Sequence, residues 1–253
     1  MKLKDKVAIV TGGGRGIGRA IACAYAREGA HVIVTAAREM HEVQAVASLT
    51  GGTALQADVA RMEDVDRVVQ TALSMYGKID ILVNNAARGM KYVSEEFMTT
   101  PTRFWQTDPE TWRMIIDTNI NGVFLMTRAV VPVMLRQRYG RIINMTINQQ
   151  TMRRKGFSPY GPSKAALESM STIWSQDLEG TGITLNMLLP GGATLTGMIS
   201  STFPESQRKE LLDPDVIGPA AVYLASDEAA HVNGQRIVAL EWNKERGVEF
   251  KKP

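Results

Sequence analysis

The sequence contains only one cysteine, Cys23, among its 253 residues. A single thiol cannot form an internal disulfide or a thiolate metal cluster, so the sequence is not that of a disulfide scaffold or a cysteine-rich metal protein. No apolar run reaches the roughly 18 residues that a membrane span needs. The first residues, Met1–Lys6, are charged and have no apolar signal core behind them. We therefore expect a cytoplasmic protein with no membrane partner.

Charge of neither sign is concentrated in the sequence. Its 29 basic and 26 acidic residues give a net charge of +3. The basic clusters are Lys2/Lys4/Lys6, Arg153–Lys155 and Lys251–Lys252, and no aromatic residues are interleaved with them. We expect these clusters to be solvated, and we expect no nucleic-acid partner. The three histidines, His31, His41 and His231, lack the spacing of metal ligands, so no metal site is predicted.

Short apolar runs rich in β-branched residues alternate with longer helical patterns. The predicted strands are 7–10, 32–35, 54–57, 81–83, 141–145, 183–189 and 236–240. The predicted helices are 17–28, one after Arg38, 62–76, about 109–138, 160–179 and 214–225. Most of the strands are apolar on both faces, which is typical of a parallel sheet covered on both sides. The pattern predicts a single α/β domain over residues 1–253, a Rossmann-type doubly wound parallel sheet of about seven strands flanked by helices.

An irregular segment of about residues 88–107 follows one predicted strand. It contains Tyr92, Phe97, Phe104 and Trp105, which we expect to be exposed. The segment lies at the carboxyl edge of the predicted sheet, where open α/β folds bind their ligands. A substrate-side loop and a surface insertion packed on its own aromatic residues are the two interpretations.

Glycines are concentrated where the first predicted strand meets the first helix. Thr11–Gly18 reads T-G-G-G-R-G-I-G, with Gly12, Gly16 and Gly18 spaced as G-x3-G-x-G. Such a turn lets backbone amides and a helix N-terminus face a pyrophosphate. No Gly-Lys-Ser/Thr follows the turn, which argues against a nucleoside-triphosphate loop.

Several motifs occur together in the order and spacing of one enzyme family. They are Thr11–Gly18, Asn84–Ala87, Asn119, Tyr160-x3-Lys164 and Pro190–Gly191. In these residues the chain resembles the short-chain dehydrogenase/reductase family, and it is similar to the branch that includes the 3-oxoacyl-carrier-protein reductases. The resemblance covers nearly the whole chain. It implies a nicotinamide cofactor and a small carbonyl or alcohol substrate, and it does not identify that substrate.

The end of the second predicted strand bears on the choice of cofactor. A carboxylate there would bind the ribose 2′-hydroxyl of NAD(H) and repel a 2′-phosphate. Here Arg38 follows the strand, and Arg15 lies in the glycine turn. Two arginines suit a phosphate dianion, so NADP(H) is favoured and NAD(H) stays an alternative. The resemblance further implies that Asp58 and Val59 hold the adenine. It also places Asn85 and Ala86 on the ribose and nicotinamide side, and Gly12, Gly16, Ile17, Gly18, Pro190 and Gly191 in the cofactor site.

Tyr160 and Lys164 are predicted to share one face of a helix, since they are four residues apart. A tyrosine with its usual pKa near 10 is a poor acid at neutral pH. A neighbouring ammonium and an oxidised nicotinamide both favour the phenolate, which brings the pKa toward working pH. Lys164 can also bind the cofactor ribose, and Tyr160 contacts the same cofactor. The resemblance implies that Asn119 holds a water that links Lys164 to solvent.

One member of the family's catalytic set is missing. The family places a serine thirteen residues before the tyrosine, and Ile147 occupies that position here. Isoleucine cannot bind the substrate oxygen. Asn148, or less favourably Thr146, could replace the serine if a bulge or register slip follows the strand.

Two further features depart from or extend the family pattern. The family's usual Asp-Gly-Gly turn at the end of the last strand is replaced by Val238–Asn243, and Trp242 there either packs in the core or shapes a substrate pocket. The helix 160–179 carries more apolar surface than one face of the sheet can cover. The family resemblance implies that this surface forms a subunit contact in a homotetramer, with a dimer as the alternative.

The sequence thus leads to one main hypothesis and two alternatives. The main hypothesis is an NADP(H)-dependent oxidoreductase that interconverts a ketone and a secondary alcohol, with Tyr160, Lys164, Asn119 and Asn148 as catalytic residues. The first alternative is a dinucleotide-binding relative with weak or no reductase activity that acts as a sensor or structural subunit. The second is a lyase or isomerase on the same scaffold.

Overall fold

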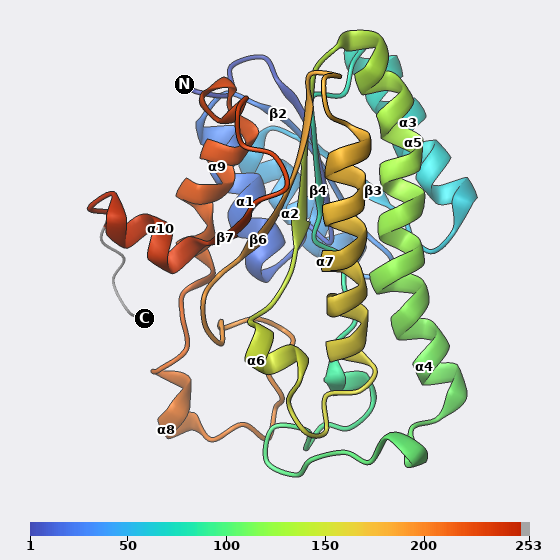
Figure 1. The fold of residues 1–253 in the computed structure, drawn as a ribbon, viewed down its shortest axis with the longest axis vertical. Helices are drawn as coiled ribbons and strands as arrows, with labels where there is room; N and C mark the ends of the chain where they lie inside the picture. Colours follow the sequence, from blue (N-terminus) through green and yellow to red (C-terminus); the bar gives the residue numbers. More distant parts are fainter. Residues whose placement is uncertain (249–253) are drawn as a thin grey trace.

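The structure, a computed structural model, describes residues 1–248, so the Lys251–Lys252 cluster lies outside the described residues. Its centre is a seven-stranded parallel sheet in the order β3-β2-β1-β4-β5-β6-β7. Figure 1 shows the sheet between layers of helices. The strands are β1 (Val7–Thr11), β2 (His31–Ala36), β3 (Thr53–Gln56), β4 (Ile81–Asn84), β5 (Gly140–Met145), β6 (Ile183–Leu189) and β7 (Arg236–Val238). The predicted parallel sheet of seven strands is confirmed. All seven carboxyl ends meet at one edge of the sheet, and the motif residues lie there.

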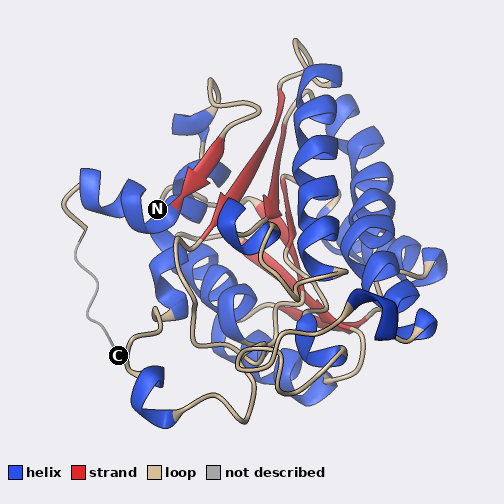
Figure 2. Cartoon of the chain, turned by 60° about the horizontal axis from the view of Figure 1, so that its bottom comes forward, coloured by secondary structure: helices blue, strands red, loops and turns tan. Residues whose placement is uncertain are grey.

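Helices cover both faces of the sheet (Figures 1 and 2). The helices are α1 (Gly16–Arg27), α2 (Met40–Thr50), α3 (Met62–Tyr76), α4 (Pro109–Ile116), α5 (Gly122–Gln137), α6 (Gln149–Met152), α7 (Tyr160–Asp177), α8 (Glu205–Arg208), α9 (Gly218–Ala225) and α10 (Ala239–Glu245). The predicted helix over 214–225 begins as a 3₁₀ turn, Pro214–Ile217, and continues as α9.

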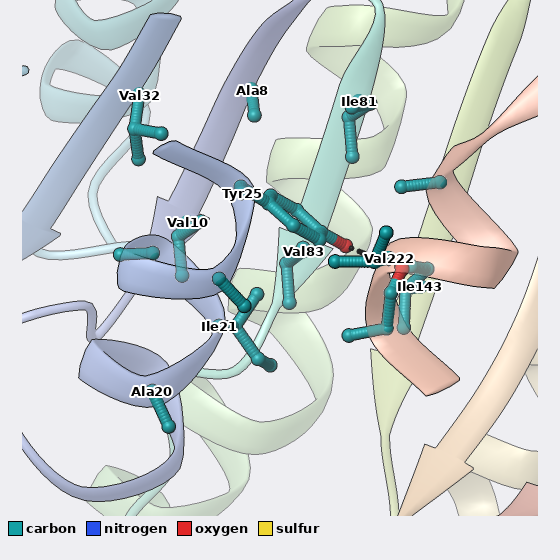
Figure 3. Close-up of a cluster of buried hydrophobic side chains, with 14 of the residues drawn as sticks. Ala8, Val10, Ala20, Ile21, Tyr25, Val32, Ile81, Val83, Ile143 and Val222 are labelled. Atoms are coloured by element: carbon teal, nitrogen blue, oxygen red, sulfur yellow. Dashed lines mark hydrogen bonds between the residues drawn. The ribbon is translucent and has the colours of Figure 1, made fainter. Parts of the chain in front are cut away.

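Successive side chains of the central strands point into two separate cores. Ala8 and Val10 pack with residues of α1, α2 and α9, whereas Ile9 packs with residues of α3 and α5. Figure 3 shows the first core, where the hydroxyl of the fully buried Tyr25 donates a hydrogen bond to the carbonyl oxygen of Ala221 (3.2 Å). Strands with apolar residues on both faces need such a layer on each side.

A long helical segment runs beside α7 from Pro109 to Gln137 (Figure 1). Its two helices, α4 and α5, are joined by a π-turn over Asp117–Asn121. By length and composition alone this segment could cross a membrane, but half of its most apolar window is buried inside the protein. Val130 and Met134 belong to the core between α5 and the sheet, so the segment is a core helix.

The last predicted strand is shorter than expected. β7 ends at Val238, and Leu240 lies in α10 instead of extending the strand. Trp242, on α10, packs against Tyr223 with ring centroids 5.3 Å apart, and the Arg246 guanidinium lies 4.1 Å from the Trp242 ring. Within this chain Trp242 therefore has the packing role, and a helix replaces the family's glycine turn.

Residues 88–107 form an irregular loop with short 3₁₀ turns at Met90–Tyr92 and Phe104–Gln106. Phe104 and Trp105 are exposed, as expected, but the expectation for Phe97 was wrong. Phe97 is buried edge-on against Phe157, with ring centroids 5.7 Å apart. The loop is therefore anchored on the segment that leads into α7.

Candidate active site

The glycine turn is fixed by hydrogen bonds from the neighbouring strand end. The side-chain amide of Asn85 donates to the carbonyl oxygens of Thr11 (2.9 Å) and Gly12 (3.0 Å). In return, the Thr11 hydroxyl accepts from the backbone amides of Asn85 and Ala86, both at 3.0 Å. These contacts join the ends of β1 and β4, so Asn85 shapes the turn as well as lining it.

Gly12 and Gly18 are among the positions of the turn that require glycine. Gly12 has a φ of 62°, in the left-handed region that side chains disfavour. A Cβ atom on Gly18 would overlap the carbonyl oxygen of Gly12. The turn therefore passes closely over the start of α1 and leaves the backbone open to a ligand on its outer side.

A cavity of about 460 Å³ opens over this turn at the carboxyl edge of the sheet. Ten of the predicted cofactor residues line it: Gly12, Arg15, Gly16, Ile17, Gly18, Arg38, Asp58, Val59, Asn85 and Ala86. The size is that of a small-molecule or cofactor site. A glycine cradle with no room for Cβ atoms, next to a helix N-terminus and two arginines, fits a dinucleotide pyrophosphate.

The charges around the end of β2 in this cavity differ from expectation. The sequence suggested that no acid opposes a 2′-phosphate, but Glu39 and Glu42 also line the cavity. The Arg15 guanidinium lies 3.2 Å from a carboxylate oxygen of Glu42, whereas Arg38 is exposed. Arg15 is thus already paired with an acid, which leaves Arg38 as the less encumbered cation for a phosphate.

Arg88 is a residue of this cavity that sequence reasoning missed. Its guanidinium lies 3.5 Å from a carboxylate oxygen of Asp58 and 5.6 Å from the Tyr92 ring. Arg88 directly follows the Asn84–Ala87 motif, which was the available signal. It adds a further cation to the cavity, beside the residue expected to hold the adenine.

Tyr160 and Lys164 lie on the same face of α7, next to the end of β5. Lys164 is 3% exposed, and its Nζ donates to the carbonyl oxygen of Met145 (2.8 Å) and lies 6.0 Å from the Tyr160 ring centroid. Burial lowers the pKa of Lys164 to about 8. Burial of the phenol raises the pKa of Tyr160 to about 12. Lys164 therefore changes from the charged to the neutral form at a lower pH than an exposed lysine does.

Met198 separates Tyr160 from the cavity. Its sulfur lies 4.0 Å from the Tyr160 hydroxyl, and Met198 itself lines the cavity together with Thr196 and Gly197. Tyr160, Lys164, Pro190 and Gly191 are not among the residues that line the cavity in this form of the protein. The chain segment around Met198 therefore contacts the tyrosine on one side and borders the cavity on the other.

Asn119, in the π-turn, connects the 88–107 loop to α7. Its side chain accepts from the backbone amide of Arg88 (2.8 Å) and donates to the Arg88 carbonyl oxygen and to the Ser163 hydroxyl, both at 3.0 Å. The Ser163 hydroxyl donates to the carbonyl oxygen of Tyr160 (2.7 Å). The fully buried Asn119 side chain is thus engaged in holding the site together, and Ser163 is a second residue that the sequence did not suggest.

The segment after β5 shows what surrounds the missing serine. Ile147 is half-buried and offers no polar side-chain atom. The Thr146 hydroxyl donates to Glu168 (2.8 Å), which engages it away from a substrate oxygen. The side-chain amide of Asn148 points to the carbonyl oxygen of Gly191 at 3.4 Å, so Asn148 lies beside the Pro190–Gly191 motif. The hydrogen bond of Asn148 is longer than that of Thr146, so of the two proposed replacements Asn148 is the more available donor for a substrate oxygen.

The histidines form no metal-binding group in the part of the chain that the structure describes. His31 stacks on Tyr76 with ring centroids 4.9 Å apart. Among residues 1–248, no group of three or more histidine, cysteine or acidic side chains is arranged to hold a metal ion.

Comparison with known proteins places this geometry in context. The family profile described as short chain dehydrogenase matches residues 6–207. The 3-oxoacyl-[acyl-carrier-protein] reductase of a Synechocystis species is 33% identical over 249 residues, covering 92% of this chain and 94% of that protein. The corresponding reductase FabG of Escherichia coli is 33% identical over 248 residues, covering 94% and 96%.

Solved structures agree with the sequence relatives. The 3-ketoacyl-(acyl-carrier-protein) reductase of Brucella melitensis, complexed with NADH, superposes with a TM-score of 0.82 at 29% identity, covering 93% of this chain and 97% of that one. A putative short-chain alcohol dehydrogenase of Sinorhizobium meliloti gives the same TM-score and identity, covering 94% and 96%.

Proposed function

The chain belongs to the short-chain dehydrogenase family, and from that premise we propose that it interconverts a ketone and a secondary alcohol with NADP(H). The observation that carries the proposal is the placement of Tyr160 and Lys164. They share one face of α7, and the glycine-lined cavity opens at the same edge of the sheet. A proton donor next to a dinucleotide site is what carbonyl reduction requires.

In this proposal each residue has a defined part. A nicotinamide cofactor supplies or accepts the hydride when it is bound. Tyr160 donates the proton to the substrate oxygen during reduction and removes it during oxidation. The Lys164 ammonium favours the phenolate, which opposes the upward shift that burial gives to the Tyr160 pKa. Asn119 supports the proton path to solvent, and Asn148 takes the place of the missing serine as a donor to the substrate oxygen.

The preference for NADP(H) is supported by Arg38 in the adenosine end of the cavity. The pairing of Arg15 with Glu42 weakens that support, and the Brucella melitensis relative is described with NADH. Any test must therefore compare both cofactors. We assign Asp58 and Val59 to the adenine, Asn85 and Ala86 to the ribose side, and Pro190 and Gly191 to the nicotinamide side.

The second candidate function is dinucleotide binding with weak or no turnover. The observation that favours it is Ile147 at the serine position, since an apolar side chain stabilises no developing oxyanion. A protein of this kind would serve as a sensor or structural subunit.

Self-association of a cytoplasmic protein is part of the proposal. Phe124 and Ile173, on α5 and α7, are 47% and 54% exposed. Phe124 also lies close to Trp174, with ring centroids 6.3 Å apart, so an exposed aromatic side chain of α5 packs on α7 beside the chain neighbour of Ile173. We propose that the surface around Phe124 and Ile173 forms the subunit contact of a homotetramer, or of a dimer. Light scattering on wild type and Ile173→Glu measures the state, and an unchanged mass in the variant argues against this contact.

The experiment that tests the function is consumption of NADPH and, in parallel, of NADH against small ketones, 3-oxoacyl thioesters and cyclic diketones. Binding of each cofactor is followed separately by its fluorescence. Turnover of any member supports the reductase. Tight NADPH binding without turnover across the panel supports the second candidate. No binding of NADPH or NADH contradicts both.

A further inference from the structure

The chain segment that leaves β5 is held by three polar side chains in succession. The Met145 carbonyl oxygen accepts from Lys164 (2.8 Å). The next residue, Thr146, donates its hydroxyl to a carboxylate oxygen of Glu168 (2.8 Å). After it, the carbonyl oxygen of Ile147 accepts from the Arg236 guanidinium (2.7 Å). Each residue from the strand end to the serine position therefore has its own restraint.

Arg236 and Glu168 act as one unit. The Nε of Arg236 donates to the same Glu168 oxygen that Thr146 uses, at 2.8 Å. The two side chains are 24% and 18% exposed, so most of this ion pair is removed from water. A largely buried pair contributes little net stability, because desolvation offsets much of the attraction. The pair does fix the local geometry, because the planar Arg236 guanidinium binds the Glu168 carboxylate and the Ile147 carbonyl oxygen at the same time.

The pair also connects the two sides of the site. Glu168 lies one helical turn after Lys164 on α7, and residues four apart share a helix face. Arg236 begins β7, the edge strand next to β6. Through the Ile147 carbonyl, the pair therefore sets the position of the β5 exit relative to the helix that carries Tyr160 and Lys164.

We propose that Arg236 and Glu168 are positioning residues for the catalytic centre, which hold the Met145–Asn148 segment at a fixed distance from Tyr160 and Lys164. This proposal rests on the proposed reductase function. Where Ile147 stands at the serine position, the proposed donor to the substrate oxygen, the Asn148 amide, belongs to this short segment. Its backbone position then decides whether the Asn148 amide reaches the substrate oxygen.

Two variants separate positioning from folding. Arg236→Met removes both bonds of the guanidinium, and Arg236→Lys keeps the charge and can restore one of them. We expect Arg236→Met to lower kcat by about tenfold to a hundredfold, since a misplacement near 1 Å has that effect. The Kd for NADPH should stay within about threefold, because the glycine turn, Arg38 and Asp58, which line the cavity, lie on other segments. Arg236→Lys should recover part of the kcat.

Amide hydrogen exchange gives a readout that does not depend on turnover. In Arg236→Met, exchange should rise in peptides that cover Met145–Asn148 while β1 and β4 keep their protection. Arg67→Met is the matched control, because Arg67 also bonds a carboxylate, of Asp64 (2.8 Å), and a carbonyl oxygen, of Gln56 (2.6 Å), away from this segment. The control should change neither kcat nor exchange at Met145–Asn148.

The outcomes separate this proposal from the reductase proposal. Local loss of protection with no wild-type turnover contradicts the reductase and leaves the restraint of the segment demonstrated. Unchanged protection at Met145–Asn148 in Arg236→Met overturns the positioning role. Loss of protection across the whole sheet, or no recovery of kcat in Arg236→Lys, assigns the pair to general stability and overturns it as well.

Discussion

The sulfur of Met198 lies 4.0 Å from the phenolic oxygen of Tyr160. Burial of the phenol raises the pKa of Tyr160 to about 12, and Met198 is one of the residues packed against the phenol. A substrate oxygen that reaches the phenol would therefore lie close to Met198. Met198 belongs to the residues between β6 and α8 that include Thr196 and Gly197 and that also border the cavity.

Met198→Ala should bring the pKa of Tyr160 down toward its usual value near 10, because it admits water to the phenol. NMR titration of ring-labelled tyrosine without cofactor measures this pKa, and the signal is assigned by its loss in Tyr160→Phe. Met75→Ala, at an exposed position of α3, is the control and should leave the value unchanged. A Tyr160 pKa that stays near 12 in Met198→Ala would show that other groups bury the phenol.

Arg38→Asp should weaken NADPH binding by about tenfold or more, since it exchanges a charge-assisted contact for repulsion at the ribose. Glu42→Gln should have the opposite effect, because it releases Arg15 and removes a negative charge from the same end of the cavity. Fluorescence titration with NADPH and NADH measures both. If neither substitution changes the ratio of the two affinities, the arginines do not select the cofactor.

Asn148→Ala should reduce turnover by about 10²–10³, which is the usual effect of removing one donor to a developing oxyanion. NADPH affinity should change little. Ile147→Ser is the opposing variant, since it restores the family's hydroxyl. A strong gain in Ile147→Ser, together with no loss in Asn148→Ala, would mean that Asn148 is not the replacement.

Lys164→Met should change how stability depends on pH. The folded pKa of Lys164 is about 8 against an ordinary value of 10.5, so between these values the unfolded chain binds more protons than the folded one. The free energy of unfolding of the wild type, relative to Lys164→Met, should then rise by about 2 kcal/mol between about pH 7 and pH 10.

Urea unfolding of the cofactor-free protein measures this difference at each pH. Lys155→Met, at an exposed position, is the control and should show no such rise. A flat difference for Lys164→Met would mean that Lys164 is solvated in the native protein.

Local sequence patterns were sufficient to predict much of the fold. Apolar runs such as Ile183–Leu189 predicted the strands, because a strand that is buried on both faces is apolar at nearly every position. The glycine turn was equally readable, since Gly12 and Gly18 are required by backbone geometry. The replacement of the last turn by α10 was not, because a helix of seven residues leaves only a weak pattern.

Several of the errors involve contacts between distant parts of the chain. Phe97 is buried because Phe157 lies against it, and Arg15 is paired because Glu42 reaches it from α2. The bond between Arg236 and Ile147 spans 89 residues of sequence. No local pattern encodes such a pair, so the restraint on the β5 exit became visible only in the folded chain.

The proton transfer assigned to Tyr160 is the central claim, and comparison of Tyr160→Phe with wild type tests it most directly. Both proteins would be mixed with NADPH and the best ketone of the panel, and NADPH oxidation followed by absorbance, with NADPH affinity measured in parallel. Only the phenolic hydroxyl differs between them, so we predict that Tyr160→Phe loses nearly all turnover while its NADPH affinity stays close to that of wild type. A Tyr160→Phe variant that keeps most of the wild-type rate would contradict the account.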